Sequence, residues 1–402
     1  MGKAETYRVG AARGEITPSL AKKVYLAGFQ VNRTAKGVLH PLTANALYVE
    51  DASGSALCLV ALDLIGFQYP HVEQVRARVE HVLPRERVMV CATHTHAGPD
   101  TLGMWGKGWL GIPFRSGVDP EYMAFVVERA ADVVEKAKAD AKPAVLKVAT
   151  FDTPPHWVRN ERKGGGKYPR AVMLVAEQEG EEKPVVLLNF AAHPEALWDG
   201  NRLVSPDYPG PFRSWLERLG VRQALFFSGP LGAMLTPDVP LSARAEPRRA
   251  FIERFGRELA DFTFGKLGAA VELAGPIRLV RRRLSLENRN PRFEWGKKLG
   301  LLVREIPAGK IETEMVAGSI GDWRFVTVPG EASPEVGDRL YDAIREGHRM
   351  IFALGNDELG YIIPAVSFAQ REYRYEQSMS VGPHSAPTCV STAYELVEEL
   401  GK

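Results

Sequence analysis

The sequence contains few cysteines, no long hydrophobic run and almost no net charge. Only Cys58, Cys91 and Cys389 occur among 402 residues, and this small, odd number excludes a disulfide framework. No apolar stretch approaches the length of a membrane span, and the first residues lack the apolar core of a signal peptide, so we expect a cytoplasmic protein for the chain as given. Lys and Arg number 51 against 49 Asp and Glu. This balance gives no reason to expect nucleic acid or an anionic membrane as a partner.

The composition and the order of apolar runs predict a globular α/β protein. Hydrophobic residues make up 45% and charged residues 25% of the chain, which is average for globular domains. Apolar runs bounded by turn residues predict strands at 56–64, 87–92, 145–149, 171–175, 184–190, 224–227, 323–328 and 350–354. Amphipathic periodicity predicts helices at 120–141, 244–267, 334–346 and 391–400. We therefore expect a mixed, mostly parallel sheet with flanking helices, and a half-exposed strand at 277–287.

Three of the predicted strands end in residues that can bind a metal. His94 and His96 follow the strand at 87–92, His193 follows 184–190, and Glu331 follows 323–328. Ligands of α/β proteins gather at the carboxyl ends of strands. In an extended segment, residues two apart point the same way, so both His94 and His96 could face one site. Imidazole and carboxylate groups are typical ligands of Zn²⁺, which suggests a zinc site at these strand ends.

Each of these residues also has an ordinary structural explanation. His94 and His96 could be a hydrogen-bonded pair in a loop, and His193 could be a satisfied histidine at the edge of the core. Glu331 could serve as a favourable charge near the start of the helix predicted from residue 334. The coincidence of all three strand ends favours the metal site over these separate explanations.

Three loops are candidates for substrate contacts. The Gly-rich segment 228–238 could form an anion or oxyanion nest with its backbone N–H groups, or could be an ordinary turn. The segment 102–114 is rich in Gly and aromatics and could be a lid, an acyl-binding wall or a packed surface loop. Residues 372–384 include two tyrosines, and the local sequence does not distinguish between Tyr373 and Tyr375.

Five motifs in order resemble one known family. They are THTHAGPD at 93–100, NFAAHPEAL at 189–197, SGPLGAMLTPD at 228–238, TVPGEASPE at 327–335 and RYEQSMSVGPH at 374–384. Together they are similar to the neutral/alkaline non-lysosomal ceramidase superfamily, and the resemblance extends over residues 7 to 386. It implies a ceramidase-like catalytic domain built from two interwoven subdomains over 1–402, with a possible subdomain change near 270–290. It also implies that the usual C-terminal β-sandwich domain is lacking.

The resemblance assigns metal and catalytic roles to individual residues. It implies that His94, His193, Glu331 and Tyr375 bind one zinc ion, with a second divalent ion as an open possibility. A zinc-bound water would attack the carbonyl of an amide (N-acyl) bond. His96 would transfer a proton to the leaving amine, and Tyr375 would also stabilise the oxyanion.

Further roles follow less directly from the resemblance. A substrate-binding arginine of the family corresponds to Arg162 or Arg159. A motif that contains an important serine in the family is replaced here by GAMLTPD. This segment is one residue longer, and Thr236 carries the hydroxyl nearest to the position of that serine. We expect the substrate to contact four other residues of these motifs and of the loop that follows the first motif: Asp100, Trp105, Gly232 and Glu195.

Three hypotheses about function follow. The first is a zinc-dependent amide hydrolase acting on ceramide or on a smaller, lipid-like N-acyl compound. The second is a related metal-dependent acyl transfer, ring-opening or ring-closing enzyme of small-molecule biosynthesis, which the altered GAMLTPD segment motivates. The third is a metal- or lipid-binding protein without catalysis. The sequence leaves the substrate, the number of metals and the oligomeric state open.

Overall fold

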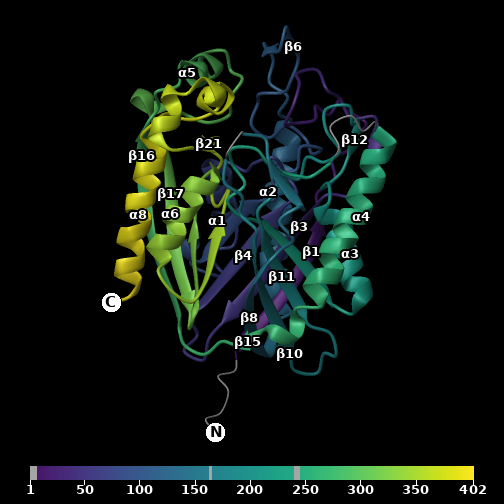
Figure 1. Ribbon diagram of the computed structural model, residues 1–402, viewed down its shortest axis with the longest axis vertical. Coiled ribbons are helices and arrows are strands. Elements are labelled where there is room, and N and C mark those ends of the chain that lie inside the picture. The colour runs from purple at the N-terminus through teal and green to yellow at the C-terminus, as the bar shows by residue number, and fades with distance from the viewer. Residues whose placement is uncertain (1–6, 163–164, 240–244) are drawn as a thin grey trace.

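Two β-sheets packed face to face form the centre of the protein. The computed structural model describes residues 7–162, 165–239 and 245–402 (Figure 1). The apolar layer between the sheets contains Leu59, Leu174 and Leu225 from the larger sheet and Trp323 and Phe352 from the smaller one, all almost completely buried. Helices cover the outer face of each sheet (Figure 1). The result is a four-layered α/β/β/α arrangement.

The larger sheet has nine strands. Eight of them follow the order β13, β11, β10, β8, β1, β3, β4, β5, and β15 pairs with β8. Their bounds are β1 Tyr7–Glu15, β3 Thr43–Glu50, β4 Ala56–Leu62, β5 Val88–Ala92, β8 Lys142–Asp152, β10 Arg170–Gln178, β11 Val185–Phe190, β13 Gln223–Ser228 and β15 Val271–Glu272. The expected α/β class with a mixed sheet is confirmed.

Parallel pairing is less extensive than the sequence predicts. In the larger sheet only β4–β5 and β11–β13 are parallel among the paired strands, and the other pairs are antiparallel. The physical reason lies in the connections: residues 51–55 join β3 to β4, and 179–184 join β10 to β11. A parallel neighbour needs a crossover of about a dozen residues or more, so these short links enforce antiparallel pairs.

The smaller sheet is formed by the second half of the chain. It has the order β16, β17, β18, β20, in which β18 and β20 are parallel. The bounds are β16 Ile277–Glu287, β17 Lys310–Ile320, β18 Trp323–Thr327 and β20 His348–Phe352. The predicted strand at 277–287 is confirmed as β16. The remaining pairs are short: β2 Gly37–Val38, β6 Gly108–Trp109, β7 Ile112–Pro113, β9 Val158–Asn160, β12 Leu203–Val204, β14 Leu235–Pro237, β19 Glu331–Ala332 and β21 Tyr361–Ile362.

The long helices begin where the sequence supplies a start signal. In α2 the Asp119 side chain accepts a hydrogen bond from Glu121 N, and proline occupies the first turn, a combination that favours helix initiation. The helices of the larger sheet are α1 Tyr69–Arg78, α2 Pro120–Ala139, α3 Pro209–Leu219 and α4 Ala245–Phe264. Those beside the smaller sheet are α6 Pro334–Ile344 and α8 Ser385–Leu400, and two short helices are α5 Pro291–Lys298 and α7 Arg374–Ser378.

The four predicted helices are confirmed as α2, α4, α6 and α8, and α8 begins earlier than expected. The predicted first residue of the second helix, residue 244, lies outside the described residues. Among the residues that the structure describes, no helix is long and apolar enough to cross a membrane.

Candidate metal centre and pocket

The structure brings His94, His193 and Glu331 to one point. His94 follows β5, His193 follows β11, and Glu331 follows β18 at the start of β19. One carboxylate oxygen of Glu331, Oε2, lies 3.2 Å from His94 Nε2 and 3.0 Å from His193 Nε2. All three side chains are buried. Two residues from the larger sheet therefore meet one residue from the smaller sheet at the edge where these strands end.

The backbone fixes the orientation of both imidazole rings. His94 Nδ1 lies 2.6 Å from the carbonyl oxygen of Ile65, and His193 Nδ1 lies 2.8 Å from that of Leu235. A carbonyl oxygen can only accept, so each Nδ1 carries a hydrogen and each Nε2 faces Glu331. This is the arrangement of metal-ligating histidines in proteins, where the second ring nitrogen donates to a fixed acceptor.

The electrostatics at this point favour a positive charge. Burial alone would raise the pKa of Glu331, but His94 and His193 lower it to about 2. Burial lowers the pKa of His193, and the carboxylates of Glu195 and Glu331 more than reverse that effect. A proton or a cation between these groups satisfies them together. Two imidazole nitrogens and a carboxylate oxygen are a donor set that suits Zn²⁺.

His96 is the third histidine of this cluster. One ligand atom from each of His94, His96 and His193 lies within 4.8 Å of the others. The Nδ1 atom of His96 is 3.3 Å from Glu195 Oε2, and neither ring nitrogen has a hydrogen-bond partner in the described part of the chain. Burial, followed by the charges of the other two histidines and Arg33, lowers the pKa of His96 well below its ordinary value. The imidazole is therefore neutral at neutral pH.

The segment before β2 holds His96 in place. Gly28 has a φ of +102°, and a Cβ at this position would lie 2.4 Å from His96 Cγ. Only glycine is therefore compatible with both the backbone conformation and the close contact. The Arg33 guanidinium donates to the backbone carbonyl of His96, and the ring of Phe29 packs edge-on against the imidazole at a centroid distance of 5.0 Å.

Thr236 and Glu195 lie behind His96. Thr236, in β14, is buried, and its hydroxyl hydrogen-bonds to the carboxylate of Glu195. Since Glu195 also faces His96, the three residues form a chain from β14 to the cluster. The candidate hydroxyl of the GAMLTPD segment, that of Thr236, therefore bonds to Glu195, which in turn contacts His96.

Tyr375 and Arg162 come from two different segments, since Tyr375 belongs to α7 and Arg162 follows β9. Tyr375, in α7, lines the same pocket as His94 and Glu331, and its ring packs 5.9 Å from that of Tyr361. Tyr375 is 42% exposed, and the partial burial of its side chain, followed by the charges of Glu331 and Glu195, raises its pKa. Arg162 Nε donates to Glu376 in the same helix at 2.5 Å.

The two candidate arginines, Arg159 and Arg162, make different contacts in the structure. Arg159 bonds to Asp238 at 3.2 Å and to the backbone carbonyl of Val239. It therefore anchors the end of the 228–238 segment, whereas Arg162 adjoins the helix that carries Tyr375.

Two further candidate residues, Trp105 and Asp100, belong to the wall of the site and to the loop that forms it. Trp105 is buried and lines the pocket. Asp100 accepts hydrogen bonds from the backbone N–H groups of Leu102, Gly103 and Trp105, so it organises the loop that carries this tryptophan.

Gly232 packs directly against the backbone of Glu331. A Cβ there would lie 2.2 Å from the Glu331 carbonyl oxygen, and its N–H donates to Ala332 O at 2.8 Å. That N–H is therefore not available to an oxyanion, and Gly232 instead permits close packing against the candidate metal ligand.

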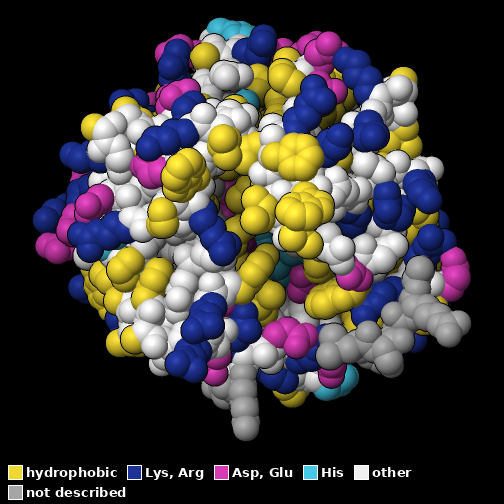
Figure 2. All heavy atoms as spheres, turned by 90° about the horizontal axis from the view of Figure 1, so that it is seen from above, with side chains coloured by type: hydrophobic (Ala, Val, Ile, Leu, Met, Phe, Trp, Pro, Cys, Tyr) yellow, Lys and Arg dark blue, Asp and Glu magenta, His cyan; other side chains and the backbone are white. Residues whose placement is uncertain are grey.

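The segment 102–114 divides into a buried and an exposed part. Leu102, Met104 and Trp105 line the pocket, whereas the β6–β7 hairpin exposes four large hydrophobic side chains: Trp109, Leu110, Ile112 and Phe114. Figure 1 shows this hairpin projecting from the top of the molecule, and Figure 2 shows hydrophobic side chains gathered on the same face.

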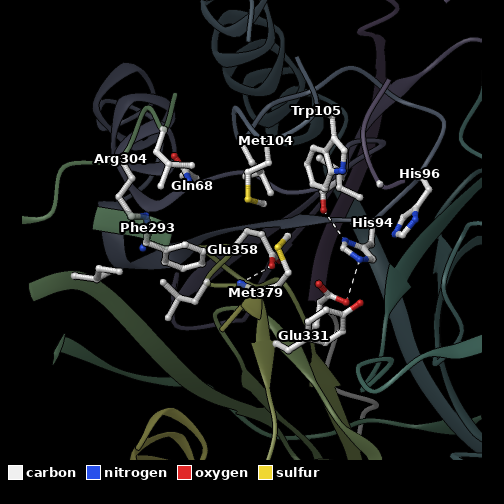
Figure 3. A pocket seen from close by; sticks show the side chains of 18 of the residues that line it. Gln68, His94, His96, Met104, Trp105, Phe293, Arg304, Glu331, Glu358 and Met379 are labelled. Carbon is white, nitrogen blue, oxygen red and sulfur yellow. Dashed lines mark hydrogen bonds and ion pairs between the residues drawn. The ribbon is translucent and has the colours of Figure 1, made fainter. Parts of the chain in front are cut away.

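The pocket has a cavity volume of about 50 Å³. His94, His96 and Glu331 lie at one end (Figure 3), and Tyr375 also lines the pocket. Sequence reasoning missed three polar residues in its wall: Gln68, Arg304 and Glu358. Glu358 could have been found, because it follows β20 in the same way that Glu331 follows β18. Gln68 and Arg304 lie in segments without a comparable signal.

Comparisons with known proteins place these observations in context. No family model matches the sequence. Three neutral ceramidases are similar to it: that of Drosophila melanogaster is 24% identical over 227 residues (53% of this chain and 32% of that protein). That of Pseudomonas aeruginosa is 24% identical over 295 residues (67% and 42%), and that of Mycobacterium tuberculosis is 26% identical over 302 residues (67% and 47%). The matched region therefore spans less than half of each relative.

The structural similarity extends over almost the whole chain. The crystal structure of neutral ceramidase from Pseudomonas aeruginosa matches 99% of this chain and 75% of its own, with a TM-score of 0.80 at 20% identity. A structure described as ceramidase complexed with C2 matches with the same coverage and TM-score at 18% identity. The chain is thus similar in part of its sequence to neutral ceramidases. It has the neutral ceramidase fold, as the sequence resemblance predicts.

Proposed function

We propose that the protein is a metal-dependent hydrolase that cleaves the amide bond of an N-acyl, lipid-like substrate. The observation that carries the proposal is the convergence of His94 Nε2 and His193 Nε2 on one oxygen of Glu331, with each Nδ1 held by a backbone carbonyl. The similarity to neutral ceramidases supports an amide as the bond and ceramide or a smaller N-acyl compound as the substrate class.

The proposed metal ligands are His94, His193, Glu331 and Tyr375. A zinc ion held by these residues would polarise the amide carbonyl and lower the pKa of a water molecule towards about 7. The backbone carbonyls of Ile65 and Leu235 keep the two imidazoles in the orientation that the site needs. Tyr375 is the one proposed ligand that comes from the short helix α7 and not from the end of a strand.

The proposed role of His96 is to carry a proton to the leaving amine. Its neutral imidazole has an unpartnered Nε2 among the described residues and can therefore accept a proton before donating it. Glu195 faces its Nδ1, and Thr236 in turn bonds to Glu195. These two residues would orient the imidazole, while Arg162 would hold the helix that carries Tyr375 through Glu376.

The test combines metal analysis with hydrolysis assays. We expect purified protein to contain zinc and to hydrolyse a member of a panel of N-acyl amides. Glu331→Gln should lose both metal and activity, whereas His96→Gln should keep the metal and lose activity. Glu335→Gln, on α6, is the matched control and should keep both.

Particular results would contradict the proposal. Full metal content and activity in Glu331→Gln would exclude it as a ligand. Loss of metal in His96→Gln would make His96 a ligand instead of the proton carrier. Zinc-loaded protein that turns over no amide, or that transfers the acyl group to an amine instead of to water, would favour a binding protein or an acyl transferase.

A further inference from the structure

The pocket that begins at the histidine cluster ends at buried polar side chains. Figure 3 shows Arg304 and Gln68 at the end of the pocket opposite His96. Each is only 5% exposed. Apart from the buried Glu358, the wall between the two ends is largely apolar and includes Met104, Phe293, Leu302, Leu359 and Met379. A pocket that binds only an alkyl chain would not need a guanidinium at its far end.

Arg304 has unused hydrogen-bonding capacity. Its Nη2 donates to Asp357 Oδ1, but Nε and Nη1 have no partner within the described residues. A buried N–H group without a partner costs free energy, so such groups are rare in folded proteins. Gln68 Oε1 is also buried and unpartnered, and its amide can present either oxygen or NH₂ to a ligand. Both side chains face the same cavity.

Asp357 does not use up the hydrogen-bonding groups of Arg304. The same Oδ1 atom accepts from Tyr69 N at 3.0 Å and from Glu358 N at 2.8 Å. Tyr69 is the first residue of α1, so the positive end of this helix also stabilises the Asp357 carboxylate. The guanidinium can therefore bind a second acceptor with its remaining N–H groups.

We propose that this end of the pocket binds a carboxylate at the far end of the substrate arm that enters it. A guanidinium is well suited to a carboxylate because both the charges and the hydrogen-bonding directions match. Met104, Phe293 and Leu302 would contact the methylene groups between that carboxylate and the amide. The inference rests on the proposed function and narrows its substrate class to N-acyl compounds that carry a terminal carboxylate.

A methyl-terminated arm of the same length fits this pocket less well. It would leave the N–H groups of Arg304 buried without a partner, and a site built to hydrogen-bond one group discriminates strongly against an analogue that lacks it. The loss of a hydrogen bond to a charged group corresponds to about a tenfold to hundredfold preference.

The first experiment compares two substrates on one protein. Pairs of N-acyl amides with the same chain length and either a carboxylate or a methyl terminus are assayed for kcat/KM. The wild type should prefer the carboxylate about tenfold or more, and Arg304→Met should lose or reverse the preference. The ratio of the two values does not depend on how much of a variant is folded. The exposed Arg289, which pairs with Glu287, provides the control Arg289→Met, with an unchanged ratio.

The second experiment measures binding without hydrolysis. A series of dicarboxylates of increasing length and the monocarboxylates of equal length are titrated into the zinc-loaded protein by calorimetry. One dicarboxylate should bind about tenfold or more tightly than its monocarboxylate, and this advantage should vanish in Arg304→Met. If Arg304→Met does not fold, Arg304→Met with Asp357→Asn removes the unpaired buried carboxylate and serves in its place.

The two experiments distinguish failure of the inference from failure of the proposed function. If no amide is hydrolysed but the dicarboxylate advantage depends on Arg304, the carboxylate subsite holds and the proposed reaction fails. If amides are hydrolysed and methyl-terminated substrates are preferred, or if Arg304→Met leaves both ratios unchanged, the inference is overturned. In that case Arg304 serves only to hold Asp357.

Discussion

Replacing Arg213 with methionine should destabilise the protein by about 3 to 5 kcal/mol, because it leaves a buried carboxylate without its charge partner. Arg213 Nη1 and Nη2 donate to the two oxygens of Asp63 at 3.0 and 2.6 Å. The arginine and aspartate side chains are 4% and 0% exposed. Thr43 and Thr93 also donate to Asp63, so the carboxylate keeps hydrogen bonds in the variant but loses the positive charge.

The pair lies directly beside the candidate metal centre. Asp63 follows β4, and it accepts a hydrogen bond from the hydroxyl of Thr93, the residue before His94. Because Arg213 belongs to α3, the pair also joins this helix to the ends of β4 and β5. Loss of the arginine should therefore weaken both the packing of α3 and the position of His94.

Urea unfolding measures the predicted loss. The midpoint should fall in Arg213→Met with an unchanged slope, which indicates that the same surface becomes exposed. Arg129→Met is the matched control: Arg129 pairs with Asp132 on the surface of α2, with side-chain exposures of 42% and 34%, and such pairs contribute about 0.5 kcal/mol or less. The double variant Arg213→Met with Asp63→Asn should recover part of the loss, since no charge stays buried.

A small effect would refute this reasoning. A loss below about 1 kcal/mol in Arg213→Met would mean that the remaining donors or water satisfy Asp63 without a cation. A double variant that is less stable than Arg213→Met would mean that the carboxylate itself, and not its pairing, organises the strand ends.

The remaining predictions concern the pocket and the metal. Gly28→Ala should lower kcat about a hundredfold with unchanged zinc content, because its Cβ would displace His96 but no proposed ligand; loss of zinc would contradict this. Trp105→Ala should cost about 3 to 5 kcal/mol in urea unfolding, whereas Trp109→Ser, at a position 73% exposed, should change stability by about 0.5 kcal/mol or less. Chelation should lower the thermal midpoint and added zinc should restore it, since a ligand of the folded state stabilises that state; an unchanged midpoint would argue against a bound metal.

The strand ends were predictable because their signal is local. A buried strand is a continuous apolar run, and His94, His193 and Glu331 stand immediately after such runs. The order of strands in the chain does not say which strands are neighbours in a sheet. The residues that follow the strands nevertheless lie along the edge at which the strands end, and so they come close together. The structure brings these three residues to one point, as the strand-end argument expects.

The partners of these residues were not predictable from the sequence. The carbonyls of Ile65 and Leu235 orient the two imidazoles, and any residue type can supply a backbone carbonyl. Tyr375 lies in the short helix α7, and Arg304 lies in the segment between α5 and β17. Neither place shows a helical or strand periodicity in the sequence, so no pattern distinguishes these two residues from other loop residues. The excess of antiparallel pairs was also missed, because apolar runs predict strands but not their directions.

The position of the site follows from how the two sheets are joined. Next to the histidines, the end of β5 is hydrogen-bonded to the segment after β20: Ala92 N donates to Leu354 O, Asn356 N donates to Val90 O, and Asn356 Oδ1 accepts from Val90 N. These bonds fix the larger sheet against the smaller one at the edge where Glu331 meets His94. A metal bound there would add a further link between the sheets. The protein that lacks the metal should therefore exchange amide hydrogens faster at Val90 and Asn356 than the zinc-loaded protein, while the centre of β10 should be unaffected.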